Sequence, residues 1–184
     1  MRKVIASLNI TLDGFIAGPE NDLDWHFPLW NDDMFTHSRE QLLTMSTIIL
    51  GRVTYESMAA YWPTAPAGDF TTMMNSYEKV VFSNSLNSVQ WRNTRLADRD
   101  IQNEIATLKE QPGDNIIIYG SGSLVQYFMS KNLIDEYRLW MHPVVIGDGV
   151  PLFKDCSQRL NLNLLRTKVL SSGVVVLYYQ PAKR

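Results

Sequence analysis

Two segments of the sequence pass from an apolar strand through a glycine directly into a helix. Residues 48–50 lead into Gly51, residues 116–119 lead into Gly120, and a helical pattern follows each glycine. In a chain where strands and helices alternate in this way, the helices cover the faces of a mostly parallel sheet. The two junctions therefore favour an α/β fold.

A helix that begins at a glycine turn presents free backbone N–H groups and the positive end of its dipole to an anion. Two such junctions in one small chain indicate a ligand with several phosphates, such as a dinucleotide. Each junction taken alone is equally typical of a tight turn and helix cap. Neither has the G-x-G-x-x-G pattern of a Rossmann unit, and the chain lacks a G-x-x-x-x-G-K-[ST] phosphate loop.

The composition is typical of one soluble globular domain, since the 184 residues are 45% hydrophobic and 20% charged. The net charge of −2, with scattered Lys and Arg, argues against a nucleic-acid partner. No apolar run approaches the ~20 residues of a membrane helix, and no signal peptide is visible. The single cysteine, Cys156, excludes an internal disulfide and is interpreted as a bystander in a reducing cytoplasm. The three histidines lack the spacing of metal ligands, so no metal is expected.

The other elements follow from hydrophobic periodicity and from turn residues. Strands are predicted at residues 3–11, 47–50, 79–82, 94–97, 115–119 and 134–142, and a C-terminal hairpin at 161–170 and 173–180. Helices are predicted from Asn31 or Asp32 to about Met45, at 53–60, from Asp98 or Asp100 to Gln111, and at 122–131. We expect one domain, residues 1–184, with a three-layer α/β architecture: a mostly parallel central sheet, antiparallel edge strands and the hairpin.

Three residues lie just past the ends of predicted strands of the sheet: Arg52, Ser83 and Gly120. Ligands of open α/β sheets bind at the carboxyl ends of the strands. The three residues therefore predict one binding site at that edge of the sheet.

Motifs in these segments occur in a recognisable order. They are Leu12-Asp13-Gly14-Phe15-Ile16-Ala17, then Gly51-Arg52-Val53-Thr54-Tyr55-Glu56, then Ile118-Tyr119-Gly120-Ser121-Gly122-Ser123-Leu124. With the later segments 133–139 and 143–153, the chain resembles the dihydrofolate-reductase-like family. It most closely resembles the reductase domain of bifunctional riboflavin-biosynthesis proteins and its stand-alone bacterial relatives. The resemblance implies NADPH as the cofactor and hydride transfer to a pyrimidine- or pterin-type small molecule.

The resemblance also assigns cofactor contacts by position. Those on the adenosine side are Gly51, Arg52, Thr54 and Ser83; those to the pyrophosphate are Gly120, Ser121, Gly122, Ser123 and Leu124; those to the nicotinamide are Ala6, Ile16 and Ala17. An arginine suits the 2′-phosphate of NADPH because its fork meets phosphate oxygens in pairs. The alternative for Arg52 is a surface salt bridge with Glu56, four residues further on.

Four residues are candidates for the substrate side. Asp13 follows the first strand, where a partly desolvated carboxylate would have a raised pKa and could transfer a proton or bind an amino group. Its alternative is an ordinary Asp-Gly turn. Trp25 and Trp30 could stack on a flat heterocycle or pin their loop to the core. Tyr119 stands where the riboflavin-pathway reductases carry a substrate-binding glutamate.

The proton donor leaves two further interpretations open. Dihydrofolate reductases carry a carboxylate near the start of the first helix, and the corresponding position falls at about Trp30, with Asp32 and Asp33 as the nearest acids. A true dihydrofolate reductase is one alternative. The other, from a different class, is a nucleotide-binding module that keeps the fold without catalytic activity.

Self-association is also expected, because relatives commonly form homodimers. The strand at 134–142 and residues 144–146 would supply an apolar edge for the interface. The alternative is that this strand lies inside the sheet and is covered by helices.

Overall fold

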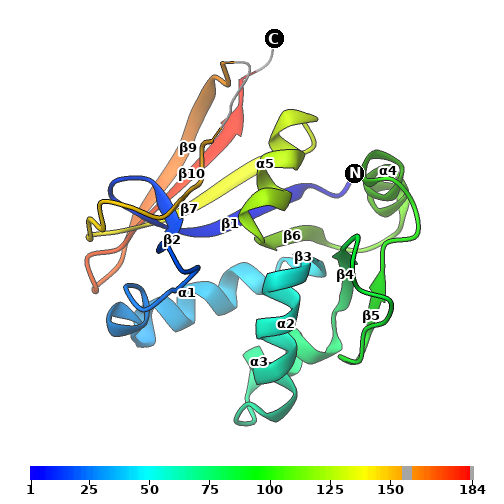
Figure 1. The fold of residues 1–184 in the computed structure, drawn as a ribbon. Helices are drawn as coiled ribbons and strands as arrows, with labels where there is room; N and C mark the ends of the chain where they lie inside the picture. Colours follow the sequence, from blue (N-terminus) through cyan, green and yellow to red (C-terminus); the bar gives the residue numbers. More distant parts are fainter. Residues whose placement is uncertain (155–158, 183–184) are drawn as a thin grey trace.

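An eight-stranded sheet forms the centre of the chain in the computed structural model, which describes residues 1–154 and 159–182 (Figure 1). The strand order is β5-β4-β3-β6-β1-β7-β10-β9. The strands are β1 (Val4–Thr11), β3 (Met45–Gly51), β4 (Glu78–Phe82), β5 (Thr94–Leu96), β6 (Asn115–Gly120), β7 (Glu136–His142), β9 (Leu162–Val169) and β10 (Val175–Pro181). The first six strands in this order, from β5 across to β7, are parallel to one another. Strand β10 is antiparallel to β7, and β9 is antiparallel to β10. The predicted sheet and hairpin are confirmed.

Helices cover both faces of this sheet. On one face lie α1 (Asp32–Leu42), α2 (Arg52–Tyr61) and α3 (Asp69–Ser76), and on the other lie α4 (Ile101–Glu110) and α5 (Gly122–Ser130). Alternate residues of one strand serve the two cores, as the two-residue period of a strand requires: Ile117 packs on the α1–α3 side and Ile116 on the α4–α5 side. The three-layer α/β architecture is therefore confirmed.

The predicted starts of α1 and α4 are correct. The Asn31 side chain accepts a hydrogen bond from the Met34 N–H, and Asp100 caps α4 in the same way. The predicted end of the first helix at Met45 is wrong, because α1 stops at Leu42 and Met45 opens β3. Phe35 of α1 is 44% exposed, whereas Met34 and Leu42 of the same helix are buried.

Several short elements were not predicted. They are helix α3, the 3₁₀ turns Phe27–Leu29 and Trp62–Thr64, and a two-stranded sheet of β2 (Phe15–Ala17) and β8 (Val150–Pro151). Each is eight residues or shorter, so its periodicity is weak. Cys156, interpreted as a bystander, lies outside the described residues. None of the helices in the described ranges is long and apolar enough to cross a membrane.

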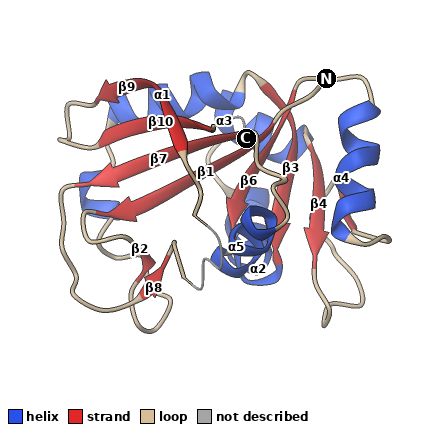
Figure 2. Ribbon diagram, turned by 90° about the horizontal axis from the view of Figure 1, so that it is seen from above, coloured by secondary structure: helices blue, strands red, loops and turns tan. Residues whose placement is uncertain are grey.

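Strand β6 comes late in the chain but inserts between β3 and β1. The register places Leu50 of β3 beside Gly120 of β6. Since both strands run in the same direction, their carboxyl ends lie next to each other, and so do the starts of the two helices that follow. In Figure 2, seen from above, α2 and α5 overlap at this end of the strands, and Figure 1 shows that they lie on opposite faces of the sheet.

Candidate functional site

The two glycine junctions are in direct contact. A Cβ atom built on Gly51 would lie 2.9 Å from the Ser121 backbone nitrogen and would also collide with Ser121 Oγ. A Cβ on Gly120, which has a φ of +132°, would lie 2.9 Å from Thr54 Oγ1. The glycines are thus required by the close approach of the β3–α2 and β6–α5 connections. The peptide bond between Gly120 and Ser121 is cis.

The first turns of α2 and α5 lack side-chain caps. Gly51, which has no side chain, and Ser121 occupy the N-cap positions, and the Ser121 hydroxyl accepts no hydrogen bond from a backbone N–H of its helix. Helices α1 and α4, by contrast, are capped by their own Asn and Asp. The first N–H groups of a helix have no partner within it, so those of α2 and α5 are left without a side-chain cap at the shared edge. This arrangement suits an anion with several phosphates.

Arg52 and Ser83 flank this edge. Arg52 Nη1 lies 2.8 Å from Glu56 Oε2, and both side chains are about half exposed, so the pair is held only weakly. Phe82, paired with Gly51 across β3 and β4, is followed by Ser83. Ser83 Oγ accepts hydrogen bonds from the backbone N–H groups of the turn that follows, at 3.0 and 3.1 Å. Arg52 and Ser83 therefore lie on the same edge as the two uncapped helices.

The small β2–β8 sheet lies against the start of α5. A Cβ on Gly122 would collide with the Ile16 side chain, and one on Gly149 would collide with the Ala17 carbonyl. Ile16 is thus next to the β6–α5 junction, and Ala17 lies against Gly149 in the loop before β8. The side chains of Ala6 and Leu124 are buried in the α4–α5 core, so any cofactor contact by these two falls to their backbone atoms.

A cavity of about 60 Å³ lies between α1 and the sheet. Its walls come from the loop before α1, α1 itself and strands β1, β6 and β7. The lining residues are Ser7, Leu8, Asn9, Trp30, Ser38, Gln41, Tyr119 and Trp140. Two predicted substrate residues, Trp30 and Tyr119, are among them. None of the lining residues carries a charge.

Trp25 lies elsewhere. Its ring meets the buried His142 edge-on, with ring centroids 5.1 Å apart, and it also contacts His26. This is the packing alternative considered for the loop tryptophans. Trp30, in contrast, lies against Trp140 in a stacked arrangement, with centroids 6.4 Å apart.

Asp13 holds a loop in place. Its carboxylate accepts hydrogen bonds from the Thr11 hydroxyl (2.6 Å) and from the backbone N–H groups of Ile146 (3.1 Å) and Gly147 (2.8 Å). The Thr11 hydroxyl does most to lower the pKa of Asp13, and the two N–H groups add to it. The expected raised pKa is therefore wrong, because the carboxylate is exposed and well hydrogen-bonded rather than desolvated.

The two acids at the start of α1 do not reach the cavity. Asp32 is exposed. Asp33 Oδ2 accepts a hydrogen bond from the Ser171 N–H at 2.7 Å, which lowers the pKa of Asp33 and fixes the turn between β9 and β10. Neither provides the buried carboxylate that the dihydrofolate reductase alternative requires.

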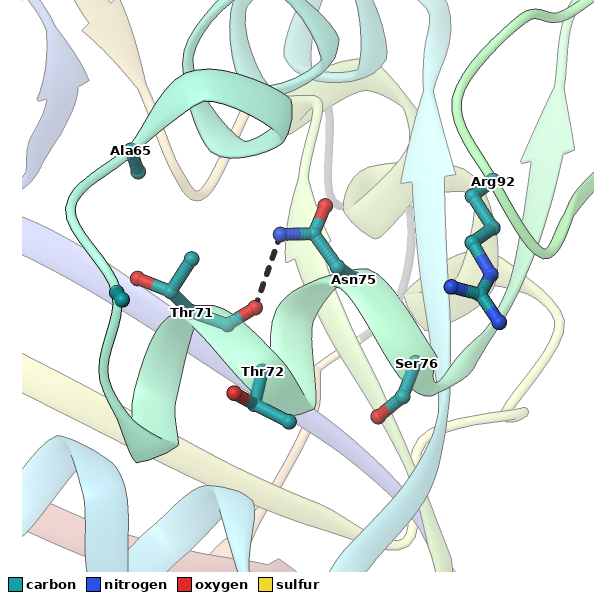
Figure 3. A pocket seen from close by; sticks show the side chains of 7 residues that line it. Ala65, Thr71, Thr72, Asn75, Ser76 and Arg92 are labelled. Atoms are coloured by element: carbon teal, nitrogen blue, oxygen red, sulfur yellow. Dashed lines mark hydrogen bonds between the residues drawn. The ribbon is translucent and has the colours of Figure 1, made fainter.

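A larger cavity, of about 390 Å³, lies beside α3 at the opposite edge of the sheet (Figure 3). Two of its polar side chains, Thr71 and Asn75, already serve the local structure. Asn75 donates to the Trp62 and Thr71 carbonyls and accepts from the Trp91 ring nitrogen, and Thr71 donates to the Pro66 carbonyl. We therefore assign the functional site to the junction edge and the smaller cavity.

Six lining residues of that cavity were not predicted from the sequence. They are Ser7, Leu8, Asn9, Ser38, Gln41 and Trp140. A signal was present in the first strand, where polar residues at a spacing of two interrupt an apolar run. In the described residues, no group of three or more His, Cys, Asp or Glu side chains could hold a metal ion.

The layers, the strand order and the paired junctions define a protein with the dihydrofolate-reductase-like fold. The sequence matches the family described as the RibD C-terminal domain over residues 2–176, and the chain belongs to this family. It is 38% identical to "Uncharacterized protein YyaP" of Bacillus subtilis (strain 168) over 183 residues, covering 97% of this chain and 94% of that protein. It is 32% identical to "Uncharacterized protein YwjB" of the same organism, covering 96% and 97%.

Solved structures show the same fold. A "Putative riboflavin biosynthesis protein" from Shewanella sp. PV-4 aligns with a TM-score of 0.80 and 23% identity, covering 98% of this chain and 99% of that one. A bifunctional deaminase and 5-amino-6-(5-phosphoribosylamino)uracil reductase from Thermotoga maritima gives 0.71 and 16%, covering 98% and 57%. A dihydrofolate reductase from Enterococcus faecalis, in complex with NADP(H), gives 0.66 and 16%, covering 98% and 97%.

Proposed function

We propose that residues 1–184 form one NADPH-dependent reductase domain. Its substrate would be a pyrimidine- or pterin-type small molecule, as in 5-amino-6-(5-phosphoribosylamino)uracil reductase. The observation that carries this proposal is the contact between two uncapped helix starts at Gly51 and Ser121, beside a polar cavity. A dinucleotide is a single ligand long enough to use both helix starts and still reach the cavity.

The residues at the junction edge fit this cofactor. Gly51, Arg52, Thr54 and Ser83 would hold the adenosine side, and Gly120 to Leu124 would hold the pyrophosphate. Ile16 and Ala17 would border the nicotinamide. When bound, NADPH supplies a hydride, and the protein orients the two rings and excludes water. Asp13, with its lowered pKa, would position the 144–149 loop rather than donate a proton.

The main alternative is a nucleotide-binding module without catalytic activity. The absence of a charged group from the cavity lining favours it, because no acid or base is present there to move a proton. Incubating the protein with NADPH and a panel of pyrimidine, pterin and dihydrofolate compounds, while following nicotinamide absorbance, separates the two. Binding without turnover across the panel would support the module.

Replacing Arg52 with alanine should weaken NADPH binding by about tenfold and NADH binding by less than about twofold. Only NADPH has a 2′-phosphate, and an exposed charged hydrogen bond to phosphate contributes roughly 1.4 kcal/mol. Titration of the intrinsic fluorescence of the protein with each dinucleotide measures both affinities.

Glu56→Gln is the matched control for Arg52→Ala. It breaks the same salt bridge but leaves the guanidinium free, so NADPH affinity should stay the same or rise. Equal losses in the two variants would show that Arg52 serves only the helix surface.

We also propose that two copies of the chain form a homodimer through β9. The protein would act in a reducing cytoplasm. Of the interface predicted at 134–142 and 144–146, the strand is wrong in position, because β7 lies between β1 and β10 and is largely buried, whereas Val145 is 65% exposed. The edge strand is β9, and it exposes apolar residues: Leu164 is 54% and Val169 is 68% exposed. Long exposed edge strands of this kind are templates for pairing.

Light scattering after size exclusion should give the mass of a dimer at micromolar concentration. The double variant Leu164→Lys and Val169→Lys should then elute as a monomer, because it places charges along the shared edge. Leu43→Lys, which changes an equally exposed leucine at the end of α1, should remain dimeric. A wild-type monomer would refute the pairing.

A further inference from the structure

The larger cavity, of about 390 Å³, lies away from the proposed cofactor site (Figure 3). It is at the amino ends of β4 and β5, because Ser76 lies two residues before β4 and Arg92 lies two residues before β5. The glycine junctions lie at the carboxyl ends of β3 and β6. Since these strands are parallel, the cavity and the junctions are at opposite ends of the sheet. A ligand of this cavity is therefore separate from a dinucleotide at the junctions.

The Arg92 guanidinium brings an unpaired positive charge to the cavity wall. The side chain is exposed and forms no hydrogen bond or ion pair with any described residue. Among the described residues, none that lines the cavity is acidic. The nearby carboxylate of Asp69 is paired with Arg39, and that of Glu78 is paired with Arg95. The Arg92 guanidinium is therefore available to bind an anion.

A second cation lies next to the cavity. Lys79 is fully buried, and no described carboxylate pairs with it. Its Nζ donates to the carbonyls of Met74, Asn75 and Tyr77, at 2.9, 3.4 and 2.7 Å. The carbonyl end of a helix repels anions, and the Lys79 ammonium offsets that repulsion at the end of α3. Burial, with a smaller contribution from the charge of Arg92, lowers the pKa of Lys79 to about 8, so an anion between them would stabilise both cations.

The rest of the wall suits an anion with a small apolar body. The Thr72 hydroxyl has no hydrogen-bond partner in the described ranges. The Ser76 hydroxyl donates only a long bond, of 3.4 Å, to a backbone carbonyl of its own helix. Both hydroxyls can therefore donate to an anion. On the other side of the cavity, Ala65 and Ala67 present methyl groups, and the volume is within the range of small-molecule sites.

We propose that this cavity is a second binding site, which takes a small organic anion with a phosphate or carboxylate group. The Arg92 guanidinium would bind two oxygens of the anionic group. The Thr72 hydroxyl would donate to one of these oxygens, and the apolar part of the ligand would lie on Ala65 and Ala67. The inference does not depend on the proposed function, because the cavity shares no residue with the glycine junctions or with the smaller cavity.

NMR titration with phenyl phosphate, benzoate and uncharged benzyl alcohol tests this inference. The readout is the backbone amide signals of Ala67 and Thr72, which report on this cavity alone. At least one of the two anions should shift these signals to saturation, and the one that binds more tightly identifies the anionic group. Benzyl alcohol should leave the signals unchanged. Arg92→Gln should weaken anion binding at least about tenfold, and Thr72→Val should weaken it about threefold.

Arg99→Gln is the matched control for Arg92→Gln. It changes an exposed arginine that lines neither cavity, so anion binding should stay at the wild-type level. Arg92→Gln should melt at or above the wild-type temperature, because it removes a charge near Lys79 and breaks no hydrogen bond.

Three results would overturn the inference. They are wild-type signals that neither anion shifts, equal shifts with benzyl alcohol, and an Arg92→Gln variant that binds the anions like wild type. NADPH affinity is measured in a separate titration and should be the same in Arg92→Gln and wild type. A protein that failed to bind NADPH would refute the proposed function and leave the result for this cavity intact.

Discussion

Replacing Gly51 with alanine is expected to weaken NADPH binding by about 100-fold, which corresponds to about 2.7 kcal/mol. The new methyl group would occupy the space of Ser121, and one of the atoms it meets is backbone nitrogen, which cannot rotate away. The β3–α2 and β6–α5 connections would have to separate, so their N–H groups would no longer converge on one ligand. Fluorescence titration with NADPH measures the loss.

The same substitution should lower the melting temperature. Overpacking a tight contact costs about 1–3 kcal/mol, which is several degrees for a chain of this size. Gly68→Ala is the control, because a Cβ there meets nothing within 4 Å and the backbone is extended. If Gly51→Ala bound NADPH with an affinity within threefold of wild type, the proposal that both glycine junctions bind one cofactor would be wrong.

Acidification from pH 6.5 to pH 4 is expected to remove about 3 kcal/mol of stability through His142. Burial, with a smaller effect from His26, lowers the pKa of His142 to about 4. The side chain is fully buried, and its Nδ1 has no partner within the described ranges. Between these pH values the unfolded chain binds a proton that the folded chain does not, so each step down in pH favours unfolding.

Urea unfolding at a series of pH values measures this effect. His142→Gln keeps a side-chain N–H for Asn9, which His142 contacts at 3.1 Å, but does not titrate. Its free energy of unfolding should therefore fall much less between pH 6.5 and pH 4. His26, whose pKa burial also lowers, leaves a residual slope. A variant with the wild-type slope would show that the acid sensitivity originates elsewhere.

Most of the fold could be predicted because short stretches of sequence determine its strands and its helix starts. The strands of the main sheet alternate or run apolar, and the caps at Asn31 and Asp100 mark helix starts in the sequence itself. The errors occur where long-range contacts decide. Met45 continues the apolar spacing of α1, yet pairing with β6 turns the chain into a strand at that residue.

The site divides in the same way. The paired junctions, where we propose that the cofactor binds, were predictable because glycines at strand ends are visible as sequence motifs. The cavity was not, because Ser7, Gln41 and Trp140 are single polar positions on three different elements. Only the packing of α1 over β1 and β7 brings them together, and no spacing within one segment encodes that.

The place of β1 in the sheet has a consequence for how the protein is made. This strand leaves the ribosome before the other strands of the sheet, but its neighbours are β6 and β7, since Val4 pairs with Ile116 and Ile5 with Glu136. Until the second half of the chain is synthesised, the apolar strand β1 therefore has neither of its neighbouring strands to pair with. Nascent chains that are arrested before β6 should bind chaperones and should not bind a dinucleotide.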